Sequence, residues 1–189
     1  PYTTLFRSHT GNGRGNIQEG MEIMPEFREN TSTYGKMKYS QLFDYPLSGK
    51  TIVVIGSPAS GKTTLGKALA AKYGQKLIHA DDYMQHGYKE ALYVMLADLI
   101  EIDEPVIVEG MQGYRLLRKG VELGNFYPDV VIELKVTDAQ VERVYRSERQ
   151  AEKLPKLSAF NKMHQTILES YKALENPHPP EWITVQNQY

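Results

Sequence analysis

From residue 51 onward, short apolar runs alternate with longer stretches in which apolar and polar residues are mixed. Valine and isoleucine dominate most of these runs, as in strands of a parallel sheet that is covered on both faces. The pattern predicts five strands, over residues 51–55, 76–80, 106–108, 129–136 and 182–185.

The stretches between the runs carry apolar residues at helical spacing. They predict helices over residues 62–73, 88–102, 138–150 and 158–174. Gly74 is a natural stop for the first of these helices. Strands that alternate with helices in this way predict an α/β domain with a parallel sheet between two helical layers.

Residues 1–36 lack any such pattern. The opening "PYTTLFRS" resembles the translation of a sequencing-adapter oligonucleotide, and the stretch after it is rich in glycine and asparagine. We therefore expect residues 1–36 to be an adapter-like scar followed by a disordered leader, and residues 37–189 to form the folded domain. Met21, Met24 and Met37 are candidate start positions.

The composition narrows the function classes. The chain has 189 residues, 41% of them hydrophobic, and 22 basic against 23 acidic residues give a formal net charge of −1. A protein that binds duplex nucleic acid by bulk electrostatics is normally more basic, so a nucleic-acid contact would have to be local, as at a 5′ end. The chain has no cysteine, which excludes thiolate catalysis and cysteine metal sites. We expect no membrane partner and a cytoplasmic location, because no apolar run approaches a membrane span and no signal-peptide core is present.

The segment "GSPASGKTTL" after the first strand fits the phosphate-binding P-loop pattern in full, with a strand before it and a helix after it. Its glycines allow backbone N–H groups to point at phosphate oxygens at a helix N-terminus. We expect Lys62 to reach the β- and γ-phosphates of a nucleotide and the Thr63 hydroxyl to bind Mg²⁺. The predicted nucleotide-binding residues are Gly56, Ser57, Ala59, Ser60, Gly61, Lys62, Thr63 and Thr64.

Acidic residues follow the second and third predicted strands. Asp81 and Asp82 stand at the sheet edge where ligands gather in α/β folds, and Asp81 is the candidate base for an attacking hydroxyl. Capping of the next helix is the structural alternative for one of the two. Glu109 follows the buried run 106–108 and is a candidate for holding magnesium through water or for orienting a substrate group, while Gly110 would let a substrate approach the backbone.

Arginines recur after the fourth predicted strand, at positions 143, 146 and 149. Phosphoryl transfer needs positive groups that neutralise developing charge, and Arg146 and Arg149 are the candidates for that role. Acidic residues lie among the arginines, so ordinary surface ion pairing is the alternative interpretation.

With these residues in place, the chain from about Tyr39 onward resembles the small P-loop kinases, and most of all the uridine and nucleoside kinase branch. The resemblance rests on the P-loop, on Asp81-Asp82-Tyr83, on "VIVEG" and on Arg146-x-x-Arg149. It implies a P-loop NTPase three-layer sandwich with a five-stranded parallel sheet in the order 2-3-1-4-5. It also implies ATP with Mg²⁺ as donor, a small hydroxyl-bearing acceptor, and Asp81 as the residue that deprotonates the acceptor.

Two other functions remain open. Phage 5′-polynucleotide kinases also join a G-x-P-x-S-G-K-[ST] loop to an Asp-Asp-Tyr turn, but the arginine that usually follows the turn is replaced here by Met84, Gln85 and His86. A nucleotide-binding switch driven by a protein partner is the second alternative. For that switch, the stretch "GYRLLRKGVELGNFYPD" would supply a docking surface.

The sequence thus predicts an ATP- and Mg²⁺-dependent kinase that acts on a nucleoside or related metabolite. Asp82, Tyr83 and Gly110 are candidate substrate contacts, and Tyr88 and Tyr114 are further candidates by placement alone. The five histidines show neither metal-ligand spacing nor the arrangement of a catalytic triad, so we assign them no role. The oligomeric state is not predicted.

Overall fold

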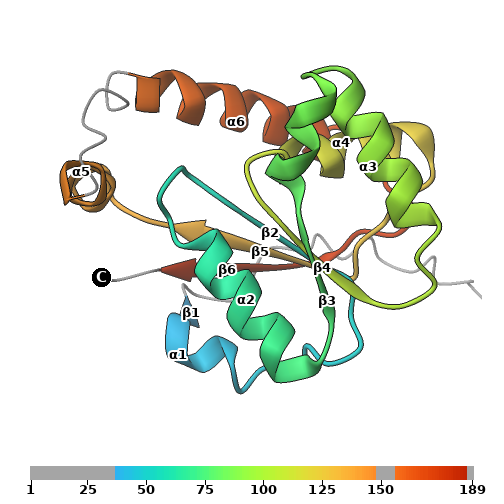
Figure 1. The fold of residues 1–189 in the computed structure, drawn as a ribbon, viewed down its shortest axis with the longest axis horizontal. Coiled ribbons are helices and arrows are strands. Elements are labelled where there is room, and N and C mark those ends of the chain that lie inside the picture. The colour runs from blue at the N-terminus through green and yellow to red at the C-terminus, as the bar shows by residue number, and fades with distance from the viewer. Residues whose placement is uncertain (1–36, 148–155, 187–189) are drawn as a thin grey trace, which may run out of the picture. The chain divides into compact units, whose positions relative to one another are not determined.

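The computed structural model describes residues 37–147 and 156–186, which form a single parallel sheet with helices on both faces (Figure 1). Every strand pairing in the sheet is parallel. The sheet has six strands in the order β1-β6-β5-β2-β4-β3. They are β1 (Met37–Lys38), β2 (Ile52–Gly56), β3 (Lys76–His79), β4 (Val106–Glu109), β5 (Val130–Lys135) and β6 (Glu181–Gln186).

The prediction of a five-stranded sheet is therefore wrong in the number of strands and in the complete order. The two-residue strand β1 adds a sixth strand at one edge, where Met37 pairs with Val185 and Lys38 with Gln186. A pairing this short leaves no hydrophobic pattern of its own, because it depends on a partner about 150 residues further along the chain. The other five strands lie in the order β3-β4-β2-β5-β6.

The described helices are α1 (Tyr39–Leu42), α2 (Lys62–Tyr73), α3 (Glu90–Ile100), α4 (Gly113–Leu123), α5 (Asp138–Ser147) and α6 (Leu157–Lys172). The four predicted helices correspond to α2, α3, α5 and α6, and the first of them has the predicted bounds, residues 62–73. A 3₁₀ helix, η1 (Ala80–His86), follows β3 directly and carries the acidic pair. The helix predicted over residues 138–150 corresponds to α5, and the part of it beyond residue 147 lies outside the described residues.

Alternate side chains of the strands point to opposite faces of the sheet and build two cores. One core packs Ile52, Val54 and Ile132 against α1 and α2. The other packs Val53, Ile55 and Val131 against α3, α4 and α6. Figure 1 shows the same arrangement, with α2 on one side of the sheet and α3, α4 and α6 on the other. The predicted three-layer α/β sandwich is thus confirmed.

Helix α4 shows which side chains of residues 113–129, the stretch considered as a docking surface, belong to the core. Tyr114, Leu116, Leu117 and Val121 of this helix are all buried in the second core. Gly120 allows the helix to approach the chain after it, because a Cβ there would lie 2.7 Å from the Phe126 carbonyl oxygen. These four side chains therefore serve the fold, whereas Leu123 at the end of the helix is 46% exposed.

Within residues 37–147 and 156–186, no helix is both long enough and apolar enough to span a membrane.

Candidate active site at the phosphate loop

The loop between β2 and α2 has the backbone shape that a phosphate needs. Gly61 caps α2 in the left-handed conformation at φ 90°, and Ala59 also has a positive φ of 57°. Gly56 is required for space, since a Cβ there would lie 2.7 Å from Ser60 Oγ and 2.8 Å from the Leu134 carbonyl oxygen. The N-terminal amides of α2 therefore open towards the loop without a capping side chain, which fits the binding of an anion.

Lys62 lies inside this loop. Its side chain is only 7% exposed, and Nζ donates a hydrogen bond of 2.8 Å to the Ser57 carbonyl oxygen. Burial lowers the pKa of Lys62 to about 8, against the opposing effect of the Asp81 and Glu109 carboxylates. The opposing effect shows that both predicted acids lie close enough to the amine to act on its charge.

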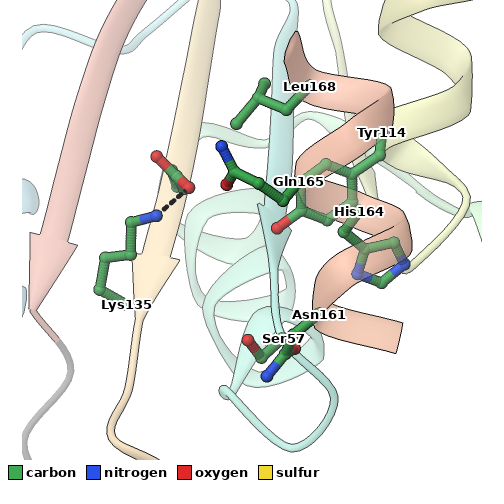
Figure 2. Close-up of a pocket in the computed structure, with 8 residues that line it drawn as sticks. Ser57, Tyr114, Lys135, Asn161, His164, Gln165 and Leu168 are labelled. Carbon is green, nitrogen blue, oxygen red and sulfur yellow. Dashed lines mark hydrogen bonds and ion pairs between the residues drawn. The ribbon is translucent and has the colours of Figure 1, made fainter. Parts of the chain in front are cut away.

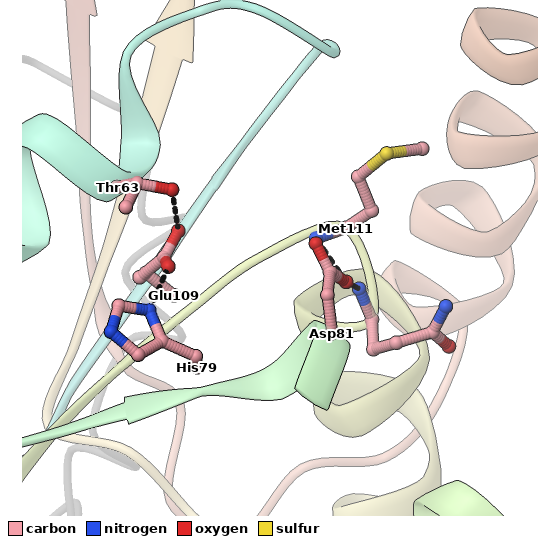
Figure 3. A network of polar contacts seen from close by, with 6 residues as sticks. Thr63, His79, Asp81, Glu109 and Met111 are labelled. Carbon is pink, nitrogen blue, oxygen red and sulfur yellow. Dashed lines mark hydrogen bonds and ion pairs between the residues drawn. The ribbon is translucent and has the colours of Figure 1, made fainter. Parts of the chain in front are cut away.

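Glu109 lies at the end of β4 and is 3% exposed. Thr63 Oγ1 donates a 3.0 Å hydrogen bond to Glu109 Oε2, and His79 Nδ1 lies 2.5 Å from Glu109 Oε1 (Figure 3). Sheet register produces the second contact, because His79 of β3 pairs directly with Glu109 of β4. Gly66 makes room for the carboxylate, since a Cβ there would lie 3.0 Å from Glu109 Cγ.

Magnesium prefers oxygen ligands, and this cluster offers a hydroxyl and a carboxylate within hydrogen-bonding distance of each other beside a phosphate-shaped loop. The residues therefore fit a magnesium ion that is also bound by a nucleotide. No group of three or more metal-ligating side chains occurs within residues 37–147 and 156–186, so a dedicated protein-only metal centre is not found there.

Asp81 is held at the start of η1 by the chain that follows β4. Its Oδ1 accepts hydrogen bonds from the Met111 amide at 3.0 Å and the Gln112 amide at 3.2 Å (Figure 3). Gly110, at φ 132°, allows this approach, since a Cβ there would lie 3.1 Å from the Asp81 carboxyl carbon. The carboxylate itself remains exposed. It is therefore fixed in position and accessible from solvent.

Asp82, Tyr83 and Tyr88 are the other candidate substrate contacts near Asp81. Asp82 is exposed. Tyr83 donates a 2.8 Å hydrogen bond to Asp98 Oδ2 of α3, and burial followed by this bond raises the pKa of Tyr83 to about 12. The Tyr88 ring lies under the Arg115 guanidinium, with 3.8 Å between the guanidinium carbon and the ring centroid. Both tyrosines thus have structural partners away from the P-loop.

Of the two arginines predicted to close over the transferred group, Arg146 lies within the described residues and pairs with a neighbour on its own helix. Arg146 forms an i,i+4 ion pair with Glu142, with 2.6 Å between Nη2 and Oε1, and its side chain is 64% exposed. Helix α5 contributes Val141 and Tyr145 to a small apolar cluster with Leu157, and Ala59 of the P-loop packs against this cluster. Arg149 lies outside the described residues.

Two histidines belong to the site, although no pattern in the sequence indicates a role for them. His79 contacts Glu109, as described above, and the only signal for it is its register opposite that residue. His164 of α6 stacks on Tyr114 with 4.3 Å between ring centroids and an interplanar angle of 9°. Both Lys62 and Asp81 act on the pKa of His164, which places α6 beside the P-loop.

A pocket of about 130 Å³ lies between α6, β5 and the P-loop (Figure 2). It is lined by Ser57, Tyr114, Glu133, Lys135, Asn161, His164, Gln165 and Leu168. Tyr114, which the sequence offered as a candidate contact by placement alone, is thus a wall of this pocket. The predicted phosphate-binding residue Ser57 is another.

Comparison with known proteins gives partial similarities to kinases. No family model matches the chain. The chain is 36% identical over 67 residues to shikimate kinase 2 of Yersinia enterocolitica, and this region spans 35% of the chain and 33% of that enzyme. The chain therefore aligns with about a third of the length of this curated relative.

Among solved structures, a shikimate kinase from Acinetobacter baumannii in complex with shikimate is 17% identical, with a TM-score of 0.49 over 74% of this chain and 84% of that one. A deoxyadenosine kinase from M. mycoides with bound dATP is 16% identical, with a TM-score of 0.48 over 72% and 90%. A gluconokinase from Sinorhizobium meliloti 1021 is 23% identical, with a TM-score of 0.40 over 73% and 82%. Each of these three structures is of a protein named as a kinase.

Proposed function

We propose that this protein is a P-loop kinase that transfers the γ-phosphate of ATP to a hydroxyl group of a small acceptor, such as a nucleoside or a related metabolite. The observation that carries the proposal is the convergence of a buried lysine and two carboxylates at one edge of the sheet. Lys62 begins α2 at the loop, its neighbour Thr63 is hydrogen-bonded to Glu109, and Asp81 lies against Gly110, the residue after Glu109. This set of groups matches the needs of phosphoryl transfer.

On the donor side, the backbone of residues 56–61 and the α2 N-terminus hold the phosphates, and Lys62 exchanges its bond to the Ser57 carbonyl for phosphate oxygens. Thr63 and Glu109 would hold magnesium, and His79 fixes the orientation of Glu109. When bound, the ion supplies positive charge that neutralises the phosphate oxygens.

On the acceptor side, Asp81 receives the proton of the attacking hydroxyl. The hydroxyl oxygen forms a bond to the γ-phosphorus while the bond to the bridging β–γ oxygen breaks, and ADP leaves with that electron pair. Amide hydrogen bonds from Met111 and Gln112 fix the direction of the carboxylate. Asp81 therefore orients the hydroxyl and collects its proton late in the transfer.

Arg146 would stabilise the transferred group only after leaving Glu142. An exposed i,i+4 ion pair contributes about 0.3–0.5 kcal/mol, so a nucleotide phosphate can compete for this arginine at little cost. Arg149 is proposed for the same role from the sequence alone. The contact of α5 with Ala59 supports the proposal, because it keeps Arg146 on a helix beside the loop.

The partial similarity to shikimate kinase 2 supports a small hydroxyl-bearing acceptor as the class of substrate. That similarity covers only a third of the relative, so the acceptor has to be found by experiment. The test is ATP consumption by the full chain with Mg²⁺ across nucleosides, sugar alcohols, hydroxy acids and a 5′-hydroxyl oligonucleotide. We expect marked stimulation by one small hydroxyl compound.

Asp81→Asn and Asp82→Asn form the matched pair for this test. We expect Asp81→Asn to lower the stimulated rate on the order of 10²–10⁴-fold with ATP binding retained, and Asp82→Asn to have a far smaller effect. Loss of ATP affinity in Asp81→Asn would contradict its role as acceptor base. Stimulation by the oligonucleotide alone would favour the polynucleotide kinase, and a slow rate indifferent to every acceptor would favour a partner-driven ATPase.

A further inference from the structure

The pocket between α6, β5 and the P-loop is not used by the mechanism above. Its volume of about 130 Å³ is smaller than the roughly 300–1,000 Å³ of a complete small-molecule site. It therefore has room for one part of a small molecule. Ser57 lines it, so whatever occupies the pocket lies next to the phosphate-binding loop.

Asn161 and His164 of α6 both line this pocket, and each has one buried polar atom without a hydrogen-bond partner among the described residues. His164 is 4% exposed, and neither its Nδ1 nor Asn161 Oδ1 has a hydrogen-bond partner among the described residues. The two residues are three positions apart, which places them on one face of the helix (Figure 2). Leaving buried polar atoms unpaired is unfavourable for folding, so two of them on residues that line one cavity favour a hydrogen-bonding occupant, either water or a polar group of a ligand.

The charges around the pocket indicate what kind of ligand fits. Burial and the neighbouring Lys62 lower the pKa of His164 to about 4, against the opposing effect of Asp81, so the ring is neutral near pH 7. On the opposite wall, Glu133 is 7% exposed, forms an ion pair with Lys135 and accepts a 3.2 Å hydrogen bond from Trp182 Nε1.

Lys135 is the one cationic side chain among the eight residues that line the pocket, and Glu133 already neutralises it. A carboxylate or phosphate placed here would meet a buried carboxylate and a neutral imidazole, with no unpaired cation from these eight residues. A hydroxyl group would instead donate to the unpaired atoms of Asn161 and His164. The stack on Tyr114 holds the His164 ring in place for that bond.

We propose that this pocket is the subsite for an uncharged, hydroxyl-bearing part of the acceptor, in which Asn161 Oδ1 and His164 Nδ1 accept hydrogen bonds from ligand hydroxyl groups. The proposal rests on the kinase function above and sharpens it. The acceptor is then a neutral polyhydroxyl compound, such as a sugar alcohol or a nucleoside, and not the corresponding acid or phosphate.

The test separates binding from turnover. Calorimetry with the full chain and a non-hydrolysable ATP analogue measures the binding of two matched pairs, glucitol against gluconate and uridine against uridine 3′-phosphate. His164→Phe and Asn161→Leu remove the unpaired atoms at nearly constant volume, and Thr166→Ala on the exposed face of α6 is the control. Acceptor kinetics are measured for the same variants.

We expect the neutral member of at least one pair to bind more tightly than its anionic partner. We also expect His164→Phe and Asn161→Leu each to weaken that binding about five- to tenfold, with a matching rise in acceptor KM, and Thr166→Ala to change it less than twofold. Preference for the anion, binding of neither neutral compound, or an effect confined to the KM for ATP would overturn the proposal.

The outcomes also distinguish this subsite from the kinase function. Binding of a neutral compound that is weakened by His164→Phe, without any acceptor-dependent ATP consumption, would keep the subsite and refute the kinase. Acceptor-dependent turnover with an unaltered acceptor KM in both variants would keep the kinase and refute the subsite.

Discussion

His164 is predicted to make the fold sensitive to acid. Its pKa is about 4 in the folded protein against 6.5 for an unperturbed histidine, because burial and Lys62 disfavour the charged ring while Asp81 only partly compensates. Between these two values the unfolded chain binds more protons than the folded one. The free energy of unfolding therefore falls as the pH falls through 6.5, and this loss is complete below about pH 4.

The size of the effect follows from the two pKa values. Each pKa unit corresponds to about 1.4 kcal/mol, so the full difference is about 3 kcal/mol as an upper limit. At pH 5 the linkage relation gives a loss of about 2 kcal/mol relative to pH 8. His164→Phe removes the titrating group and keeps a ring to stack on Tyr114. Its unfolding free energy should therefore lack this part of the pH dependence.

Urea unfolding between pH 8 and pH 4.5 measures this effect, with the fluorescence of Trp182 as the probe because this side chain packs against the core. The wild-type curve contains contributions from carboxylates, which cancel when the His164→Phe curve is subtracted. The exposed His86→Gln variant is the control and should follow the wild type. Parallel pH curves for wild type and His164→Phe would refute the reasoning.

The remaining predictions concern glycine substitutions. Gly66→Ala places a Cβ 3.0 Å from Glu109 Cγ, so the carboxylate should shift away from Thr63. The Mg²⁺ concentration for half-maximal ATP turnover should then rise several-fold, and an unaltered Mg²⁺ requirement would contradict this prediction. Gly120→Ala places a Cβ 2.7 Å from the Phe126 carbonyl oxygen, where backbone and not a flexible side chain must yield, so urea unfolding should show a loss of about 1–3 kcal/mol. Gly74→Ala is its comparison, since it meets nothing within 4 Å and carries only the cost of a left-handed backbone, about 1–2 kcal/mol.

The strands and the P-loop could be predicted because their signals are local. Residues 52–55 are fully buried, as a run of valine and isoleucine indicates, and the glycine spacing from Gly56 to Gly61 encodes the loop within six residues. The start of α2 at Lys62 follows from the same motif. In each case the residues that determine the structure are neighbours in the sequence.

The features that the sequence did not reveal depend on distant partners. Strand β1 exists only because Met37 meets Val185. Helix α4 is not among the helices predicted from the sequence; it begins at Gly113 and contains Gly120, and both glycines serve close packing. His79 contacts Glu109 because the register of β3 against β4 places the two residues opposite each other, and this register cannot be derived from the sequence pattern.

His164 shows how a cost in stability can itself identify a functional position. A phenylalanine at this position would stack on Tyr114 without an unpaired nitrogen and without sensitivity to acid, so packing alone does not account for the histidine. Its neighbours include the P-loop lysine and the candidate base, both of which act on its charge. Proteins depart from the rules of stable packing mainly at functional sites. The same variant therefore separates the two contributions, because His164→Phe should fold at least as well as the wild type at neutral pH while it binds the acceptor less tightly.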